Sequence, residues 1–309
     1  MKTVYLNNFM SSVVTELERN GQYSTAHVCG SVLRSVMTFD GDGLLLSGIT
    51  PLWLKAYEHY LLHKGEKGLE WNTISTYMRM LRAVYNRAVV RKLVPFVPHL
   101  FREVFTGRKA DHQRVLERDD MRQLLAEKDL DSISPGMEWA RACLELMFRF
   151  HGMPFVDLAH LRKSDLKDGY LTLRRRKTGM PLSARVDSRA MQLLERYRNR
   201  DDTSPYLLCF LDGSLEGMAA YRDYLRILRL LNSKLRALAL WRKVQGKVTS
   251  YTARHTWATA GKYCHIPIEI ISEGLGHASV TTTEGYMKGF GNSRMDRANK
   301  VIMNYIFES

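Results

Sequence analysis

Three residues near the end of the chain are of types that suit chemistry at a phosphate group. Arg254 lies in the run Tyr251-Thr-Ala-Arg-His-Thr-Trp-Ala-Thr, His277 follows 23 residues later in Leu-Gly-His-Ala-Ser, and Tyr286 comes nine residues after His277. A guanidinium fork can bind two phosphate oxygens at once, and a phenolic oxygen can act as a covalent nucleophile. Singly these residues say little, because a lone tyrosine is usually a packed aromatic. Their joint spacing is the informative feature.

That joint pattern resembles the catalytic end of the tyrosine recombinase (phage integrase) family. The matching segments are Arg-His-Thr-x-Ala-Thr from Arg254, Leu-Gly-His-x-Ser around His277, and Thr-Thr-x-x-Tyr ending at Tyr286. The resemblance covers essentially the whole chain. It implies that Tyr286 attacks the scissile phosphorus, forming a 3′-phosphotyrosyl bond and freeing a 5′-hydroxyl. Covalent capture divides one hard displacement into two easier ones and stores the phosphodiester energy, so the resemblance implies no cofactor, metal or ATP.

The resemblance also assigns roles to the residues around the nucleophile. The transition state gains negative charge on its equatorial oxygens, which fixed donors stabilise. Arg254 would bind these oxygens, and His277 would donate to one of them or help to position Tyr286. The departing 5′-oxygen needs a proton donor, and Lys177, in Arg-Arg-Lys-Thr-Gly at a predicted hairpin turn, matches the family's lysine. Lys177 could instead be one more phosphate-contacting cation.

Two positions depart from the family pattern. Tyr251 stands where the family has a histidine three residues before Arg254. A tyrosine can donate a hydrogen bond, but it is no general base near neutral pH. The family's first arginine, in Gly-x-Arg-x-x-Glu, is replaced by Pro154, and Asp157 takes the acidic position. This replacement resembles a sub-branch of the family found in mobile elements and invertible DNA segments.

A proline has no charge to supply at position 154. Either another cation takes the place of the missing arginine, or the enzyme works with less stabilisation of the transition state. Arg149, five residues before Pro154, is our first candidate. Its competitors are Arg174, Arg175 and Arg176, since a phosphate site favours a fork-shaped cation.

The composition indicates a polyanionic partner. Lys and Arg total 46 against 32 Asp and Glu, which gives a net charge of +14 and a pI near 9.7, and nucleic acid is the commonest polyanion in a cell. The four cysteines form no Cys-x-x-Cys pair, which excludes the usual zinc-ribbon spacings and favours reduced thiols in the cytoplasm. The first residues fit neither a signal peptide nor a membrane span.

The elements that must position these residues fall into two parts, and the length of 309 residues also favours two domains. Hydrophobic periodicity and stop signals predict helices in the first part at 7–19, 24–39, 51–63 and 72–91. The second part is expected to hold a hairpin that turns at Thr178-Gly179 and helices at 118–127, 136–151, 188–199, 218–243, 252–263, 267–275, 280–287 and 293–307.

The predicted fold class is mainly α (α+β). By the family resemblance, residues 1–104 form a helical SAM-like core-binding domain that binds DNA, and residues 117–309 form a mixed α/β catalytic domain with a small β-sheet. The polar stretch 105–116 has no long apolar period and is expected to be the linker between them.

Clusters of arginine indicate where double-stranded DNA would bind. Phosphate backbones are contacted by clustered cations, although a single basic stripe is often only a solvated face. The candidates lie on one helix of the first part, on the hairpin and on the long helix of the second part: Arg79, Arg82, Arg174, Arg175, Arg176, Arg222, Arg226 and Arg229. The family resemblance implies a clamp of two domains around the duplex.

Several functions remain open. The leading one is a site-specific recombinase, either for integration and excision of a mobile element or for inversion of a DNA segment. The chain begins almost directly at the core-binding helices, which favours recombination between short inverted repeats. Pro154 favours a catalytically idle DNA-binding protein, against which the set of Tyr286, Arg254, His277 and Lys177 argues. A type IB topoisomerase shares the chemistry.

The resemblance also implies an oligomeric partner. It predicts a monomer when free and a homo-tetramer on two synapsed sites. A final helix within Asn292 to Ser309 has Val301, Ile302, Tyr305 and Ile306 as apolar residues. This helix could dock on the neighbouring subunit or on its own domain.

Overall fold

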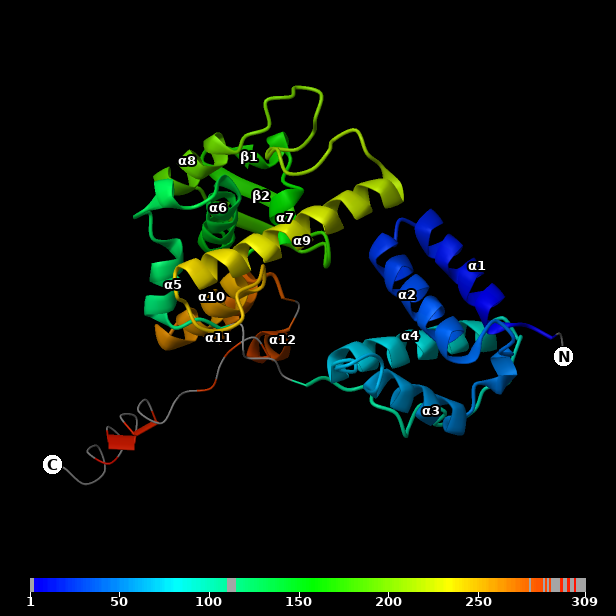
Figure 1. Cartoon of the computed structure of the whole chain (residues 1–309). Coiled ribbons are helices and arrows are strands. Elements are labelled where there is room, and N and C mark those ends of the chain that lie inside the picture. The colour runs from blue at the N-terminus through cyan, green and yellow to red at the C-terminus, as the bar shows by residue number, and fades with distance from the viewer. Residues whose placement is uncertain are drawn as a thin grey trace. The chain divides into compact units, whose positions relative to one another are not determined.

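The computed structural model describes residues 3–109, 115–277, 279–285, 287, 289, 295–296, 299–300 and 303. The chain divides into two compact units (Figure 1). The first comprises Met1–Ala110 with Leu215–Tyr221, and the second comprises Asp111–Ser214 with Arg222–Ser309. Among the described residues, no helix combines the length and the apolar character that a membrane crossing requires.

The first unit is helical. Its elements are α1 (Leu6–Arg19), α2 (Tyr23–Asp40), η1 (Leu46–Gly48), α3 (Pro51–Leu62) and α4 (Trp71–Val90). Thr50 begins α3, because its hydroxyl accepts a hydrogen bond from the amide of Trp53 at 3.2 Å and Pro51 occupies the first turn. The apolar stripe of α4 faces the core, where Leu81 and Val84 are buried.

Residues 105–109 belong to the first unit by their contacts. The amide of Phe105 donates to Oε1 of Glu58 at 2.6 Å, and the side chain of Asn72 forms two hydrogen bonds of 2.9 Å with the backbone of Lys109. The predicted linker at 105–116 therefore begins too early, because these polar residues bond to helices α3 and α4. We keep the two-domain division as a proposal, with the linker placed after Lys109.

The second unit mixes helices with one small sheet. Its elements are α5 (Arg118–Leu125), η2 (Leu130–Ser132), α6 (Pro135–Arg149), α7 (Phe155–Ala159), η3 (Lys163–Asp165), β1 (Leu166–Lys167), β2 (Tyr170–Arg174), β3 (Pro181–Arg185), α8 (Ser188–Arg196), α9 (Gly217–Trp241), α10 (Thr252–Tyr263), α11 (Ile268–Gly274) and α12 (Val280–Glu284). The predicted fold class, mainly α with a small sheet, is confirmed. Sequence reasoning missed α7 and β1, which are too short to show a period.

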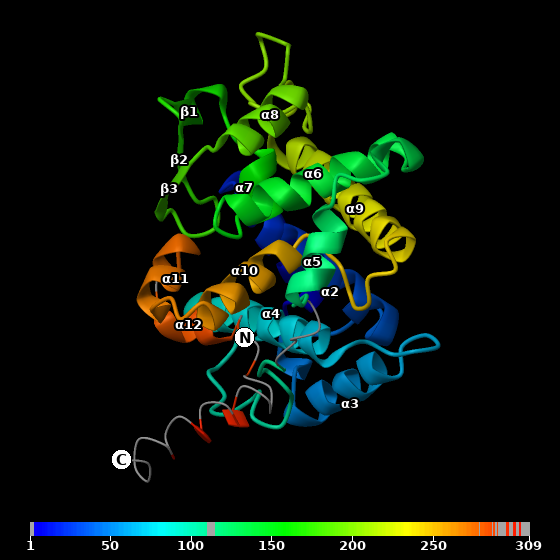
Figure 2. The same cartoon turned by 90° about the vertical axis from the view of Figure 1, so that its left-hand side faces the viewer.

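The three strands form an antiparallel sheet in the order β1-β2-β3. Leu171 pairs with Ala184 across β2 and β3, and both side chains are buried in the main core of the unit. Figure 2 shows the sheet beside α7. The turn between β2 and β3 carries residues 175–179, so the sheet fixes where these basic residues stand.

Helices α10, α11 and α12 lie together as a group, and α10 also packs against α6 (Figures 1 and 2). Ala258, Ile271, Leu275 and Met287 make the group's small core. This group holds the segments with Arg254 and His277. The predicted helix at 280–287 ends at Glu284 as α12, and most of the predicted helix at 293–307 lies outside the described residues.

Candidate active site

Arg254 stands in the first turn of α10, with its side chain buried. Nη1 donates to the carbonyl of Gly152 at 3.0 Å, and Nη2 donates to the carbonyl of Leu275 at 2.7 Å. Gly152 has φ +66°, and a Cβ at that position would lie 2.9 Å from the Cα of Arg254. Only glycine therefore lets the segment before α7 approach this closely, and the guanidinium is fixed between two chain segments.

His277 follows α11 and contacts Arg254 directly. Nη2 of Arg254 lies 2.7 Å from Nε2 of His277, and Nδ1 of His277 lies 2.8 Å from Oγ1 of Thr283. A guanidinium can only donate, so Nε2 is the acceptor and the ring proton is on Nδ1. Sequence reasoning expected His277 to donate to a phosphate oxygen or to help position Tyr286. In the free protein, Nε2 instead accepts a hydrogen bond.

The imidazole of His277 is neutral at physiological pH. Burial and, after it, the cations Arg254, Arg175 and Lys177 together lower the pKa of His277 to about 4. A charged imidazolium would face three positive side chains with less solvation than in water. The free protein therefore has a proton-accepting nitrogen next to the arginine that the sequence pattern assigns to phosphate binding.

The other residues of the predicted catalytic set lie as follows. Lys177 is exposed in the turn between β2 and β3. Tyr251 occupies the N-cap position of α10 and is 40% exposed, so a molecule from solvent could reach it. Tyr286 lies outside the described residues.

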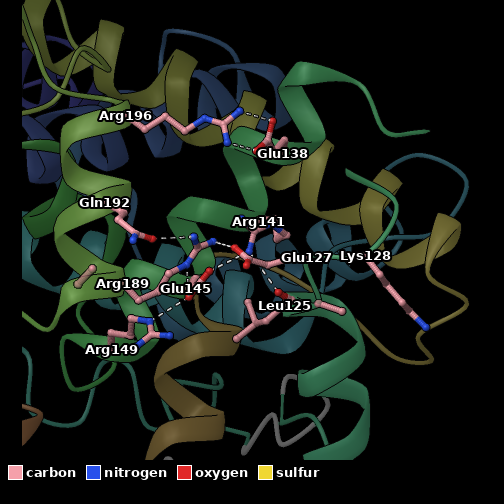
Figure 3. A network of polar contacts seen from close by, with 12 residues as sticks. Leu125, Glu127, Lys128, Glu138, Arg141, Glu145, Arg149, Arg189, Gln192 and Arg196 are labelled. Carbon is pink, nitrogen blue, oxygen red and sulfur yellow. Dashed lines mark hydrogen bonds and ion pairs between the residues drawn. The ribbon is translucent and has the colours of Figure 1, made fainter. Parts of the chain in front are cut away.

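Arg149 is not placed to replace the missing arginine (Figure 3). Nε of Arg149 donates to Glu145 at 2.9 Å, and Nη1 donates to Asp187 at 2.7 Å. Its position at the end of α6 directs it to these two carboxylates, which neutralise it and raise its pKa despite the opposing effect of burial. Our expectation for Arg149 rested on its nearness to Pro154 in the chain, and the geometry contradicts it.

Arg175 occupies the neighbourhood of Arg254 instead. Its Nε donates to Oδ2 of Asp157 at 3.1 Å, and its Nη1 donates to the carbonyls of Leu275 and, at 3.3 Å, Gly276. The Leu275 carbonyl thus accepts from both Arg175 and Arg254. The structure therefore brings together Arg254, His277 and Arg175, of which sequence reasoning named only the first two as primary members of the site.

The remaining arginines predicted to bind DNA differ in burial and in their partners within the protein. Arg79 is half-buried, and its Nε donates to the carbonyl of Ser75 on its own helix at 3.3 Å. Arg226 forms an ion pair of 2.7 Å with Asp223, which offsets its charge. The other candidates are exposed: Arg82, Arg174, Arg176, Arg222 and Arg229.

Sequence reasoning assigned no role to two side chains that hold the site together. Asp157 receives Nε of Arg175 on one oxygen and the amide of Arg176, at 2.9 Å, on the other. Thr283 accepts from His277 and is fully buried. The acid three residues after Pro154 was a usable signal for Asp157, since a buried carboxylate requires a cationic partner. Thr283 is the second threonine of the Thr-Thr-x-x-Tyr segment, but the motif gave no sign that it accepts from His277.

Comparisons with known proteins agree along most of the chain. A profile described as "Phage integrase SAM-like domain" matches residues 5–101, and one described as "Phage integrase family" matches residues 114–290. Tyrosine recombinase XerA of Pyrococcus furiosus is 31% identical over 140 residues, which are 44% of this chain and 46% of XerA. The match thus spans about half the length of that relative.

Two solved structures share the fold. A lambda integrase tetramer bound to a Holliday junction superimposes with a TM-score of 0.63 at 16% identity, over 93% of this chain and 78% of that chain. The Tn1549 transposon integrase in complex with transposon right end DNA superimposes with a TM-score of 0.60 at 14% identity, over 97% of this chain and 99% of that chain. At these identities the likeness concerns the fold.

Proposed function

This chain belongs to the phage integrase family of tyrosine recombinases, and from that membership we propose that it is a site-specific DNA recombinase. It cleaves and rejoins DNA through a 3′-phosphotyrosyl intermediate. The observation that carries the proposal is the contact of buried Arg254 with half-buried His277, whose Nη2 and Nε2 atoms are 2.7 Å apart, with His277 nine residues before Tyr286. A fixed guanidinium beside a neutral imidazole suits an attack on a phosphodiester.

The reaction proceeds by one in-line displacement. The oxygen of Tyr286 bonds to phosphorus, the bond from phosphorus to the 5′-oxygen breaks, and Lys177 gives that oxygen a proton. Arg254 turns the N–H group that His277 accepts toward a phosphate oxygen, which releases Nε2 of His277. The phosphate's negative charge raises the pKa of His277 from its low value, so His277 can take the phenolic proton. The reverse displacement by a 5′-hydroxyl rejoins the strand.

Capture of a covalent complex tests this function. The full chain is incubated with duplex DNA that carries the recombination site and a nick beside the scissile phosphate, so that the cleaved end diffuses away. A denaturing gel should then show DNA joined to protein, and Tyr286→Phe should show none. Specific DNA binding without any covalent complex would overturn the recombinase reading and leave an idle DNA-binding protein of the same fold.

We further propose that the two sites are short inverted repeats and that the product is an inverted segment. Integration and excision of a mobile element is the second form of the same reaction. Plasmids that carry two sites in direct or inverted orientation distinguish deletion from inversion by restriction mapping.

Relaxation of supercoiled DNA that lacks a site would favour a type IB topoisomerase instead. With DNA as its substrate, the protein acts in the cytoplasm.

The first unit offers a place for a DNA backbone phosphate. A hollow of about 280 Å³ is lined by Ser31, Arg34, Ser35, Thr38, Lys64 and Tyr77. Arg34 donates to the Ser31 hydroxyl and Lys64 to the Ser35 hydroxyl, each at 3.2 Å, and among the described residues no carboxylate pairs with either cation. Two cations and several hydroxyls without an acid suit a phosphodiester, which supports this unit as a DNA-binding domain.

A groove in the second unit supports assembly into a tetramer on DNA. It has a volume of about 1000 Å³ between α5, α6 and α10 and is lined by apolar side chains that include Met121, Phe148 and Trp257. We propose that the apolar segment Val301–Phe307 of a second copy fills it. Crosslinking should give tetramers only with site DNA, and a chain ended at Gly291 should give none. Unchanged crosslinking of that shortened chain would place the segment on its own domain.

A further inference from the structure

Arg175 sits where the pocket lacks a cation. Pro154 caps α7 and offers no charge, whereas Arg175 reaches the pocket from the end of β2. We propose that Arg175 binds the scissile phosphate together with Arg254 and so replaces the arginine that is absent at position 154. The proposal rests on the proposed function, because it assigns a catalytic residue to the same displacement.

Burial separates Arg175 from an ordinary DNA-contacting arginine. It is 5% exposed, whereas its neighbours Arg174 and Arg176 are exposed. An arginine is almost never buried unless it is paired, and its partner is Asp157, whose side chain is 1% exposed. The ion pair of 3.1 Å between Nε of Arg175 and Asp157 fixes the guanidinium in the interior of the site.

The two guanidinium groups converge on one backbone oxygen. Nη2 of Arg254 and Nη1 of Arg175 both donate to the carbonyl of Leu275. Two cations that donate to the same oxygen repel each other in a poorly solvated place, and a phosphate anion bound beside them would relieve that repulsion. Asp157 offsets the charge of Arg175 on the side of its Nε.

The backbone is shaped to admit this side chain. Gly276 has φ +60°, and a Cβ there would lie 2.6 Å from Cδ of Arg175 and 2.9 Å from its Nη1. A larger residue would therefore displace the arginine from the neighbourhood of His277. Arg175 also contributes to the lowered pKa of His277, after burial and Arg254, which independently indicates that its charge is near the imidazole.

Asp157 explains how an arginine on a hairpin can substitute for one on a helix. In the family pattern an acid follows the first arginine by three residues, and Asp157 follows Pro154 by three. Here the acid binds Arg175 through Oδ2 and the amide of Arg176 through Oδ1. It thus anchors the β2–β3 turn against α7 and aims the guanidinium at the carbonyl of Leu275.

The experiment compares two DNAs of the same sequence that differ in the charge of the scissile phosphate. Nicked site DNA is prepared with a normal scissile phosphate and with a neutral methylphosphonate, and covalent complex formation is measured under single turnover. Arg175→Ala should lose about 100-fold or more in rate on the phosphate, as expected when one fixed donor to an oxyanion is removed. On the methylphosphonate it should approach the wild-type rate, because the missing charge is then no longer needed. Arg196→Ala is the control, because Arg196 pairs with Glu138 and is not a candidate for DNA binding, and it should stay near wild type on both.

A second variant tests whether destabilisation of the hairpin, and not loss of phosphate binding, slows the reaction. Arg175→Ala leaves the buried Asp157 carboxylate unpaired, which can destabilise the hairpin. The double variant Arg175→Ala with Asp157→Asn removes that charge, and it should show the same loss on phosphate and the same recovery on methylphosphonate. Wild-type cleavage of phosphate by Arg175→Ala, or equal losses on both DNAs in both variants, would overturn the proposal. A wild-type protein that forms no covalent complex would instead overturn the proposed function.

Discussion

Arg254 and His277 share a hydrogen bond of 2.7 Å in which the histidine is the acceptor. Because a guanidinium has no lone pair to offer, this contact fixes the tautomer of His277, with its proton on Nδ1 and directed at Thr283. The site of the free protein is thus satisfied by its own groups. A phosphate bound at Arg254, as proposed, would compete with these internal partners for its N–H groups.

The first prediction concerns the ionisation of His277. Since burial and nearby cations lower its pKa to about 4, its ring protons should titrate near that pH in NMR spectra of the free protein. Arg254→Ala removes one of those cations, so it should raise the pKa toward 6.5. The resonance is assigned by its loss in His277→Gln. A wild-type midpoint near 6.5 would contradict the neutral, accepting imidazole.

A second prediction concerns stability in acid. His160 contacts the carbonyl of Val156 through Nδ1 at 2.7 Å, and burial lowers its pKa to about 4. The unfolded chain binds this proton near pH 6.5, so between these two values the unfolded state holds more protons. The free energy of unfolding should therefore fall as the pH falls from 6.5 to 4, by at most about 3 kcal/mol from this residue. Urea unfolding of wild type and His160→Asn at pH 7.5 and 4.5 measures it. An equal loss of unfolding free energy in both proteins would mean that His160 does not cause the pH dependence.

The third prediction concerns Glu145, which three arginines surround (Figure 3). It accepts from Arg141 at 2.8 Å, from Arg149 at 2.9 Å and from Arg189 at 3.3 Å. The side chain of Arg141 is 0% exposed, so Glu145→Gln leaves a buried cation without its counter-charge and should cost about 3–5 kcal/mol of unfolding free energy.

The control for Glu145 is Glu138, another acid of α6. Glu138 pairs with Arg196, whose side chain is 52% exposed, so Glu138→Gln should cost about 1 kcal/mol or less. Chemical denaturation of both variants gives the comparison. Equal losses would mean that the Glu145 network contributes no more than a surface ion pair.

A fourth prediction concerns the phosphate hollow of the first unit. Arg34→Ala and Lys64→Ala should each weaken DNA binding and lower the slope of log affinity against log salt by about 1, because each removes one phosphate contact. Arg91→Ala is the control, since Arg91 is already paired with Glu16. Fluorescence anisotropy at several salt concentrations measures the slope. A hollow that does not bind phosphate would leave both slopes at the wild-type value.

The fifth prediction concerns Lys177 as the proton donor. Lys177→Ala should slow cleavage about 10²- to 10⁴-fold. Sulfur in place of the 5′-bridging oxygen leaves without a proton, so this DNA should be cleaved equally by Lys177→Ala and wild type. Arg176→Ala, on the same turn, should show no such recovery. A variant that stays slow on the sulfur substrate would assign Lys177 to phosphate binding.

The sequence was most informative where residues are close along the chain. The spacing of Arg254 and His277 indicated the site, and the predicted helix at 252–263 has the bounds of α10. Contacts across long separations could not be read, since Arg175 meets Leu275 from 100 residues away. The acceptor there is a backbone carbonyl, which every residue has. Arg149 was chosen for nearness in sequence, yet the end of α6 directs it to Glu145 and Asp187.

The β2–β3 turn also bears on how activity can be gated. Arg175 and Lys177 stand two residues apart on this turn. Asp157 of α7 attaches the turn to that helix, because it accepts hydrogen bonds from Arg175 and from the amide of Arg176. Loss of these hydrogen bonds would move both Arg175, the proposed phosphate-binding cation, and Lys177, the proposed proton donor, away from the site. An arginine at position 154 would have stayed behind on α7. If Arg175 and Lys177 act as proposed, a single change at Asp157 would therefore affect phosphate binding and proton donation together.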